Sequence, residues 1–177
     1  MNLFQEDFNL KDIFEDIHDM MSVKARARNL AFEFDVSGLT QTQFKGDRHR
    51  LRQILVNLVG NAIKFTEEGY IKFKAYTEEN KVIANQLYIE IEDTGIGVSK
   101  ENQKHIFQKF QQEDSSASRR YGGTGLGLHI SQRLAAYMGG EITLQSELEK
   151  GSIFTLTLPY LTESESASPV RKEIQEE

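Results

Sequence analysis

The sequence of 177 residues contains no cysteine, which excludes disulfide bonds and cysteine-ligated zinc and is typical of a reducing compartment. It also lacks any run approaching the roughly 20 apolar residues of a membrane-spanning helix. Positive charge is not in excess, because 21 Lys and Arg stand against 27 Asp and Glu. The net charge of -6 disfavours nucleic acid as a partner, which requires a basic face. We therefore expect a cytoplasmic domain that makes no membrane contact of its own, although its parent protein could still be anchored in a membrane.

The composition is that of a folded globular protein, with 38% hydrophobic and 27% charged residues. Residues 162–177, TESESASPVRKEIQEE, are poor in hydrophobic residues and rich in charge, so we expect a disordered tail or linker there. Residues 1–161 are then long enough for one domain with its own core and too short for two large ones.

Hydrophobic periodicity predicts alternating helices and strands along the domain. The predicted helices run from Phe8 to about Arg28 with Asn9 or Asp7 as the N-cap, over 47–65, from Glu101 to Phe107, and from Gly125 to Met138. The predicted strands are Leu30–Val36, Tyr70–Tyr76, Val82–Asp93, Glu141–Gln145 and Ser152–Pro159. Because adjacent strands read as hairpins, we expect an α/β fold with a mixed sheet covered by helices on one side.

Glycines gather in two segments, DTGIG at residues 93–97 and GGTGLG at residues 122–127. Glycine is a poor helix former, yet the second segment runs directly into a predicted helix. A helix N-terminus preceded by glycines suits an anion, because free N–H groups point outward and no Cβ blocks the approach. Taken alone, each segment is equally well explained as a tight turn with a helix cap.

The common nucleotide-binding motifs do not occur. A P-loop requires Gly-Lys followed by Ser or Thr, and the chain contains no Gly-Lys pair. The dinucleotide pattern G-x-G-x-x-G fails in every register, since Leu128 or Ile130 stands where the third glycine would be. The protein-kinase set of His-Arg-Asp and Asp-Phe-Gly is also absent. A nucleotide would therefore have to bind by another design.

A polar stripe follows one side of the predicted helix at 47–65. Asn57, Asn61 and Lys64 are spaced i, i+4 and i+7, so they share a narrow face beside an apolar arc. Buried amide and ammonium groups are costly unless they have partners. Asparagine oxygen suits Mg²⁺, and a nearby lysine can neutralise phosphate. The alternative is a helix with two solvated asparagines.

With these three segments the chain resembles the ATP-binding catalytic domain of sensor histidine kinases, in the GHKL superfamily that also contains gyrase, heat-shock chaperone ATPases and MutL. NLVGNAIKFT resembles the N box, DTGIG the first glycine box, IFQKF the F box and GGTGLGL the second glycine box. The resemblance covers roughly residues 8–160. It implies a two-layer α/β sandwich of the GHKL (Bergerat) type, with a mixed, mostly antiparallel sheet. The stretch FQQEDSSASRRYGGTGLGLHISQRLAAYMGG resembles the pattern in hybrid histidine kinases, which favours that subgroup.

The resemblance implies roles for residues at the adenine end of a nucleotide. Asp93 would accept a hydrogen bond from the adenine amino group, and Gly95 and Gly97 would let the backbone pass beside the base. Phe65 would lie near the adenine or the ribose.

At the phosphate end, the resemblance implies that Asn61 ligates Mg²⁺, that Asn57 supports it from one turn away and that Lys64 contacts phosphate. The glycine-rich segment would wrap the phosphates through Gly123, Thr124, Gly125, Leu126 and Gly127. Residues 108–122 would form a mobile lid, in which Arg119 contacts phosphate and Tyr121 is a weaker candidate, while Phe107 and Phe110 serve as hinge or core residues.

The predicted catalytic set is Asn57, Lys64 and Arg119, acting on ATP with Mg²⁺. Hydrolytic members of the superfamily carry a glutamate at the position of Asn57 as the general base, and asparagine cannot take up a proton. The resemblance therefore implies transfer of the γ-phosphoryl group to a histidine on a separate dimerisation domain, and from there to a response regulator or receiver domain.

None of the four histidines stands in the sequence context of an acceptor. His18, the nearest candidate, lacks the following Thr or Asn before a proline, so we expect a surface or capping histidine. We therefore expect that the domain does not phosphorylate itself when isolated. We also expect a monomer, since the helical hairpin by which such kinases dimerise is not recognised in these residues. Two alternatives stay open: a nucleotide-sensing or docking module without transfer, and an ATP-hydrolysing clamp of the gyrase or MutL kind, which Asn57 disfavours.

Overall fold

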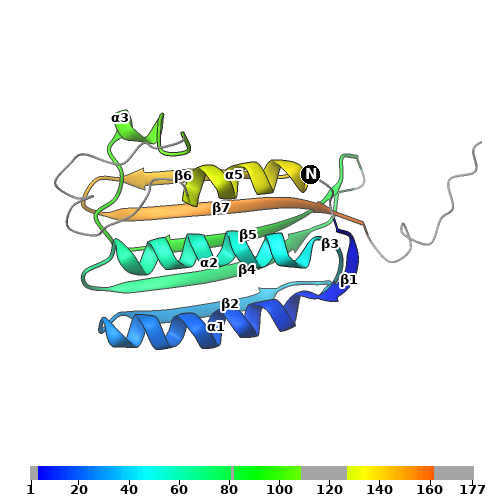
Figure 1. Cartoon of the computed structure of the whole chain (residues 1–177), viewed down its shortest axis with the longest axis horizontal. Helices are drawn as coiled ribbons and strands as arrows, with labels where there is room; N and C mark the ends of the chain where they lie inside the picture. The colour runs from blue at the N-terminus through cyan, green and yellow to red at the C-terminus, as the bar shows by residue number, and fades with distance from the viewer. Residues whose placement is uncertain (1–3, 81, 109–126, 162–177) are drawn as a thin grey trace, which may run out of the picture.

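The computed structural model of the chain describes residues 4–80, 82–108 and 127–161 (Figure 1). Its elements, in chain order, are β1 (Glu6–Asn9), α1 (Leu10–Ala27), β2 (Ala31–Gly38), β3 (Gln43–Gly46), α2 (Arg48–Lys64), β4 (Tyr70–Glu78), β5 (Asn85–Asp93), α3 (Lys100–Gln103), α5 (Gly127–Tyr137), β6 (Glu141–Glu147) and β7 (Gly151–Tyr160). They form two layers, one a sheet and the other a row of helices (Figure 1).

The main sheet has five strands in the order β2-β4-β5-β7-β6. β2 and β4 are parallel, whereas the other three neighbouring pairs are antiparallel. β1 and β3 form a separate two-stranded antiparallel sheet. The predicted mixed, mostly antiparallel α/β sandwich is therefore confirmed.

Helices α1, α2 and α5 lie side by side on one face of the main sheet (Figure 1). α1 contacts β2, α2 contacts the central strands β4 and β5, and α5 contacts β6 and β7. The core-facing side chains of the two central strands are Ile71, Phe73, Ala75, Leu87, Ile89 and Ile91, all without solvent exposure. This alternation places the hydrophobic core between the sheet and the helices.

Side-chain caps define where the two long helices begin. The side chain of Asn9 accepts a hydrogen bond from the N–H of Lys11 at the start of α1, at 2.9 Å. The side chain of Asp47 accepts one from the N–H of Arg50 at the start of α2, at 3.1 Å. Each cap pairs a backbone donor that the first helical turn would otherwise leave unsatisfied. Of the two predicted N-caps for the first helix, Asn9 is the one that forms.

The small β1–β3 sheet was not predicted from the sequence. Phe8, expected at the start of a helix, lies in β1, where it pairs with Phe44 of β3. Both phenylalanines are buried against the core. Four-residue strands that pair across more than 30 residues of chain leave no local periodicity, because their partner supplies the order.

Two other boundaries also differ from the prediction. β5 begins at Asn85 rather than Val82, and Val82 and Ile83 are 93% and 77% exposed. The strand starts where β7 offers a partner, since Asn85 pairs with Tyr160, and pairing with β4 begins one residue later, at Gln86. The short α3 ends at Gln103, earlier than the predicted helix that was expected to reach Phe107.

The opposite face of the sheet carries charged and aromatic polar side chains. Lys72 and Lys74 of β4 stand across from Glu92 and Glu90 of β5. The hydroxyl of Tyr76 donates a hydrogen bond to Glu90 at 3.0 Å. Opposite charges directly across an antiparallel pair stabilise the ladder modestly without needing burial. The sheet therefore buries one face only, as a two-layer fold requires.

Within the part of the chain that the structure describes, no helix has both the length and the apolar character needed to cross a bilayer. The longest of those helices, α1, has 18 residues and carries several charged side chains.

Replacing Phe73 by alanine tests the core. Its ring has no solvent exposure and lies 5.2 Å from the ring of Phe14 and 4.8 Å from that of Phe34, centroid to centroid. We expect Phe73→Ala to lower the free energy of unfolding by about 3–5 kcal/mol, because a large cavity opens where the sheet meets α1. Urea denaturation measures this change. Phe4→Ala is the matched control, since Phe4 is 66% exposed and should change stability by no more than about 0.5 kcal/mol. Equal effects of the two substitutions would contradict the assigned core.

Candidate functional site

The helix α2 presents two different faces at the centre of the molecule. Its apolar residues Leu51, Ile54, Leu55, Leu58, Val59, Ala62 and Ile63 are buried. Asn57, Asn61 and Lys64 lie along the edge of this buried face and are half-buried. The helix therefore holds amide and ammonium groups partly out of water, as the spacing in the sequence predicted.

Asp93 is the last residue of β5, and its carboxylate is buried close to the C-terminal end of α2. The residue is 7% exposed, and one carboxylate oxygen accepts the N–H of Gly95 at 2.9 Å. Burial raises the pKa of Asp93 to about 6, although hydrogen bonds from backbone N–H groups of Gly95 and Ser152 act in the opposite direction. A carboxylate placed like this is well suited to a partner that donates a hydrogen bond, since a new donor would offset the lost hydration.

Gly95 lies where the loop after β5 meets the end of α2. A Cβ at this position would run into the carbonyl oxygen of Phe65 and would lie 2.9 Å from both Asp93 Oδ1 and Thr66 Oγ1. The next residue, Ile96, donates its N–H to the same Phe65 carbonyl at 3.3 Å. Thr66 is fully buried, and its hydroxyl donates to the Ala62 carbonyl at 2.7 Å. Glycine is needed here because the two backbones touch.

Glycine is required at position 97 for a different reason. Its φ of +68° is a left-handed conformation, and a Cβ would run into the carbonyl of Glu147 at the end of β6. The loop is fastened to the same hairpin by two hydrogen bonds, from the Glu149 N–H to the Ile96 carbonyl at 2.6 Å and from the Val98 N–H to Ser146 Oγ at 2.8 Å. Protein contacts alone therefore explain this glycine, and its contact with a base remains a prediction.

Lys64 and Phe65 lie next to each other at the end of α2. The Lys64 ammonium is 5.3 Å from the centroid of the Phe65 ring, within the range of a cation–π contact. Phe65 is the C-cap residue, and its N–H donates to the Asn61 carbonyl at 2.9 Å. The predicted residues Asn61, Lys64, Phe65, Asp93 and Gly95 thus belong to a single region.

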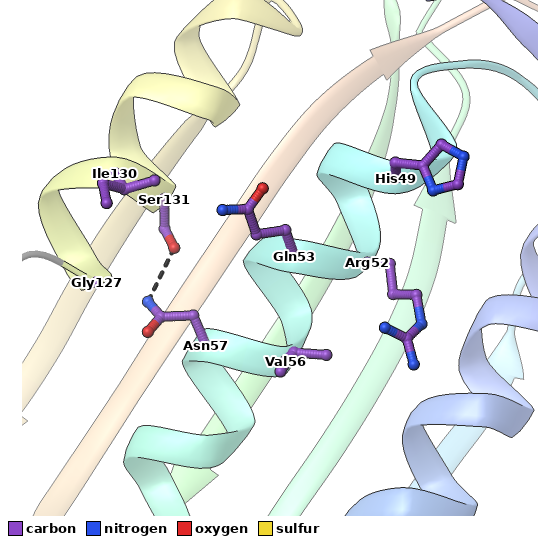
Figure 2. A pocket seen from close by; sticks show the side chains of 8 residues that line it. All are labelled: His49, Arg52, Gln53, Val56, Asn57, Gly127, Ile130 and Ser131. Carbon is purple, nitrogen blue, oxygen red and sulfur yellow. Dashed lines mark hydrogen bonds between the residues drawn. The ribbon is translucent and has the colours of Figure 1, made fainter.

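A cavity of about 430 Å³ opens between α2 and α5 (Figure 2). It is lined by His49, Arg52, Gln53, Val56, Asn57, Gly127, Ile130 and Ser131. The Nδ2 of Asn57 donates a hydrogen bond to Ser131 Oγ at 2.9 Å, and a Cβ at Gly127 would run into the Asn57 amide. The structure therefore brings the predicted Asn57 and Gly127 into contact across two helices.

Several predicted residues lie outside the described ranges: Phe110, Arg119, Tyr121, Gly123, Thr124, Gly125 and Leu126. Their roles stay predictions. Phe107, expected as a hinge or core residue, is partly buried against the core and stands edge-on to Phe154, with ring centroids 6.3 Å apart.

Among the residues that the structure describes, no group of three or more His, Cys, Asp or Glu side chains is placed to hold a metal ion. The half-buried amide of Asn61 is instead a single oxygen donor. One protein oxygen completed by phosphate and water is a common arrangement for Mg²⁺, which sheds its waters reluctantly. The donors present are thus compatible with Mg²⁺ that arrives with a nucleotide.

Three residues with a place in or beside the site were not predicted from the sequence. Ser131 accepts a hydrogen bond from the Asn57 amide, and no local pattern links these two residues, which lie 74 positions apart. Gln103 donates through Nε2 to the Val98 and Ser146 carbonyls, at 2.8 and 2.9 Å. No role as a phosphoacceptor was predicted for His129. In the structure its Nδ1 lies 3.1 Å from the Phe107 carbonyl oxygen. Apart from the contact of Gln103 with Val98, these hydrogen bonds join residues 22 to 74 positions apart in the sequence.

Comparison with known proteins identifies the family. The family described as "Histidine kinase-, DNA gyrase B-, and HSP90-like ATPase" matches residues 46–162. The sensor histidine kinase GacS of Pseudomonas protegens is 47% identical over 151 residues, which are 85% of this chain and 16% of that protein. The signal transduction histidine-protein kinase BarA of Escherichia coli is 39% identical over 150 residues, 83% of this chain and 16% of that protein. The chain thus spans about a sixth of these relatives.

Solved structures agree with this assignment. Full-length ShkA in complex with AMPPNP superposes with a TM-score of 0.78 at 32% identity, covering 92% of this chain and 32% of that one. The catalytic domain of the histidine kinase ThkA, in a nucleotide-free form, superposes with a TM-score of 0.71 at 26% identity, covering 89% of this chain and 98% of that one. The chain therefore belongs to the histidine kinase-, DNA gyrase B- and HSP90-like ATPase family, and within it corresponds to the ATP-binding domain of sensor histidine kinases.

Proposed function

We propose that this chain binds ATP together with Mg²⁺ and donates the γ-phosphoryl group to a histidine on a separate dimerisation and phosphoacceptor domain. The observation that carries the proposal is the buried Asp93 carboxylate, which lies beside a glycine loop and the end of a helix that bears Asn57, Asn61 and Lys64. The buried carboxylate and the polar edge of α2 contribute nothing to the packing of the core, whereas both suit a polar ligand.

At the adenine end, Asp93 accepts the amino group of the base, with Phe65 beside the base or the ribose. The raised pKa of Asp93 supports this role, because burial removes the carboxylate from water and its two backbone hydrogen bonds compensate this only in part. Gly95 has no side chain to occupy the site, and its backbone lies directly against the Phe65 carbonyl. A hydrogen bond to a charged acceptor is roughly twice as strong as a neutral one, so ionised Asp93 is the binding form.

At the phosphate end, Asn61 provides the amide oxygen for Mg²⁺ and Lys64 neutralises phosphate charge, which leaves Asn57 to support the same region from one turn away. Gly127 begins α5 in contact with Asn57, so the start of this helix faces the same region. Outside the described residues, Gly123, Thr124, Gly125 and Leu126 are proposed to wrap the phosphates, and Arg119 and Tyr121 to contact them. When bound, Mg²⁺ supplies charge neutralisation between the phosphates.

Transfer to a protein nucleophile is favoured over hydrolysis. Water needs a base to remove its proton, and the position at which the hydrolytic relatives carry a glutamate is Asn57 here, whose amide takes up no proton at neutral pH. A neutral imidazole nitrogen already has a lone pair, so it can form the N–P bond directly while the bond from the γ-phosphorus to the bridging oxygen of the leaving ADP breaks. Positioning and charge stabilisation then supply most of the catalysis.

The proposed partners follow from this reaction. They are the dimerisation and phosphoacceptor domain of the same kinase and, through it, a response regulator or a receiver domain of a hybrid kinase. We further propose that residues 1–161 form the catalytic domain, which the end of β7 at Tyr160 supports, and that 162–177 form a tail or linker. The domain acts in the cytoplasm, as a monomer when isolated, without binding nucleic acid or a membrane.

Asp93→Asn tests the base site. A charged hydrogen-bond acceptor contributes about 1.5–3 kcal/mol, so we expect Mg–AMPPNP to bind at least roughly tenfold more weakly at pH 8. The affinity of the unsubstituted domain should fall as the pH drops through about 6, where Asp93 becomes protonated, whereas the variant should show no such step. Calorimetric titration between pH 5 and 8 measures both. Glu90→Gln, on the same strand but on the opposite face, should keep the full affinity and the pH step.

The same substitution should stabilise the nucleotide-free fold. The folded pKa of Asp93 lies above its unfolded value of 3.8, so the folded state holds the proton more tightly and loses stability as the pH rises through about 6. Removing the charge should therefore raise the free energy of unfolding at pH 8, by at most about 3 kcal/mol, and leave it unchanged near pH 3. A variant that binds nucleotide normally, or is destabilised at pH 8, would contradict the proposed role.

Asn61→Ala tests the metal role. We expect the affinity for AMPPNP in excess Mg²⁺ to fall at least about tenfold, toward the affinity measured with a chelator, because the amide oxygen ligand is gone. Asn61→Asp keeps an oxygen at this position and should keep the dependence on Mg²⁺. If Asn61→Ala retains the full Mg²⁺ dependence, the ligand must be another residue.

Transfer is tested by mixing the domain with Mg–ATP and a separately produced dimerisation domain of a sensor histidine kinase. We expect an acid-labile phosphohistidine on the dimerisation domain, and much less of it at a low ATP concentration when Asp93→Asn replaces the parent. Nucleotide binding without any phosphohistidine would favour a sensing or docking module. Steady ATP turnover that Asn57→Ala abolishes would instead favour a hydrolytic clamp.

A further inference from the structure

Ser131 lies on α5, one helical turn after Gly127, and the nucleotide-binding boxes do not include it. It is 1% exposed, although serine is a residue that usually reaches water. Its hydroxyl oxygen accepts the Nδ2 hydrogen of Asn57 at 2.9 Å (Figure 2). The buried hydroxyl is thus directed at a residue of the neighbouring helix.

The Asn57 amide spans the first turn of α5. Its nitrogen lies at Ser131, whereas its oxygen is the atom nearest to the Cβ position of Gly127. The two ends of an amide differ in kind, because the nitrogen only donates and the oxygen only accepts. In the structure the nitrogen donates to Ser131 while the oxygen lies at the start of α5, and the hydrogen bond restrains the amide in this arrangement.

From this geometry we propose that Ser131 is a positioning residue, which restrains the Asn57 amide against α5, with its oxygen toward the phosphate end of the site. The inference rests on the proposed function, in which Asn57 supports the region around Mg²⁺ and the phosphates. Without the hydroxyl, the amide can rotate about its last torsion, and part of the binding free energy is spent on ordering it.

The competing explanation is that the hydrogen bond only joins α2 to α5. Gln132, the next residue of α5, makes a hydrogen bond of that kind, because its Oε1 accepts the Ile142 N–H of β6 at 3.0 Å. Gln132 does not line the cavity between α2 and α5. Gln132→Ala therefore removes one tertiary hydrogen bond of the same helix without touching Asn57, and it serves as the matched control.

The test is a double-mutant cycle with Mg–AMPPNP titrated into the domain by calorimetry. We expect Ser131→Ala to weaken binding about fivefold, corresponding to one neutral hydrogen bond, and Asn57→Ala to weaken it at least as much. In the Asn57→Ala background, Ser131→Ala should have no further effect, because the group that it positions is gone. Gln132→Ala should lower the melting temperature but not the affinity, and Ser131→Thr, which keeps the hydroxyl, should restore binding.

The outcomes separate this proposal from the proposed function. If the unsubstituted domain does not bind Mg–AMPPNP, both fall. If it binds and Asp93→Asn weakens binding, but Ser131→Ala matches the parent, the positioning role alone is wrong. Additive effects of Ser131→Ala and Asn57→Ala would likewise show that Ser131 does not act through Asn57. Should Ser131→Thr fail to fold, as circular dichroism would show, the comparison of Ser131→Ala with Gln132→Ala still decides.

Discussion

A carboxylate kept away from water, that of Asp93, is the constraint on which the site depends. Two backbone N–H groups compensate it only in part, so its pKa is raised to about 6. The fold carries this unfavourable group at the end of β5, a strand buried on one face along its whole length. A buried charged group that lacks part of its hydrogen bonding until a ligand donates to it is a common feature of functional sites. Burial of the Asp93 charge therefore lowers the stability of the nucleotide-free fold and at the same time favours binding of a hydrogen-bond donor.

The helix α2 connects this carboxylate to the rest of the site. Its apolar side is part of the core, which fixes the helix over β4 and β5 and leaves little freedom to the polar residues along its edge. Its C-cap residue Phe65 contacts the loop after Asp93, and Asn57 in the middle of the helix contacts α5. One rigid element thus sets the distance between the two ends of the site.

The loop after β5 is held from its other side by the β6–β7 hairpin. Ser146 is the centre of that contact, because its hydroxyl oxygen accepts the Val98 N–H while its backbone carbonyl accepts Gln103 Nε2. Gly97 allows the close approach. The backbone after Asp93 therefore packs against the end of α2 at Gly95 and against the hairpin at Gly97. The two glycines belong to one motif, but each permits a different close contact.

The sequence by itself determined the α/β class, the two long helices, the strands of the main sheet and the family, because these depend on local periodicity and on short motifs. It also predicted the stripe of Asn57, Asn61 and Lys64, since spacing along a single helix is a local property. It could not predict β1 and β3, the start of β5 at Asn85, or Ser131 as the partner of Asn57. Those features arise from pairings across tens of residues, from Phe8 with Phe44 to Asn57 with Ser131, and only the tertiary structure decides them because each partner is ordered by the other.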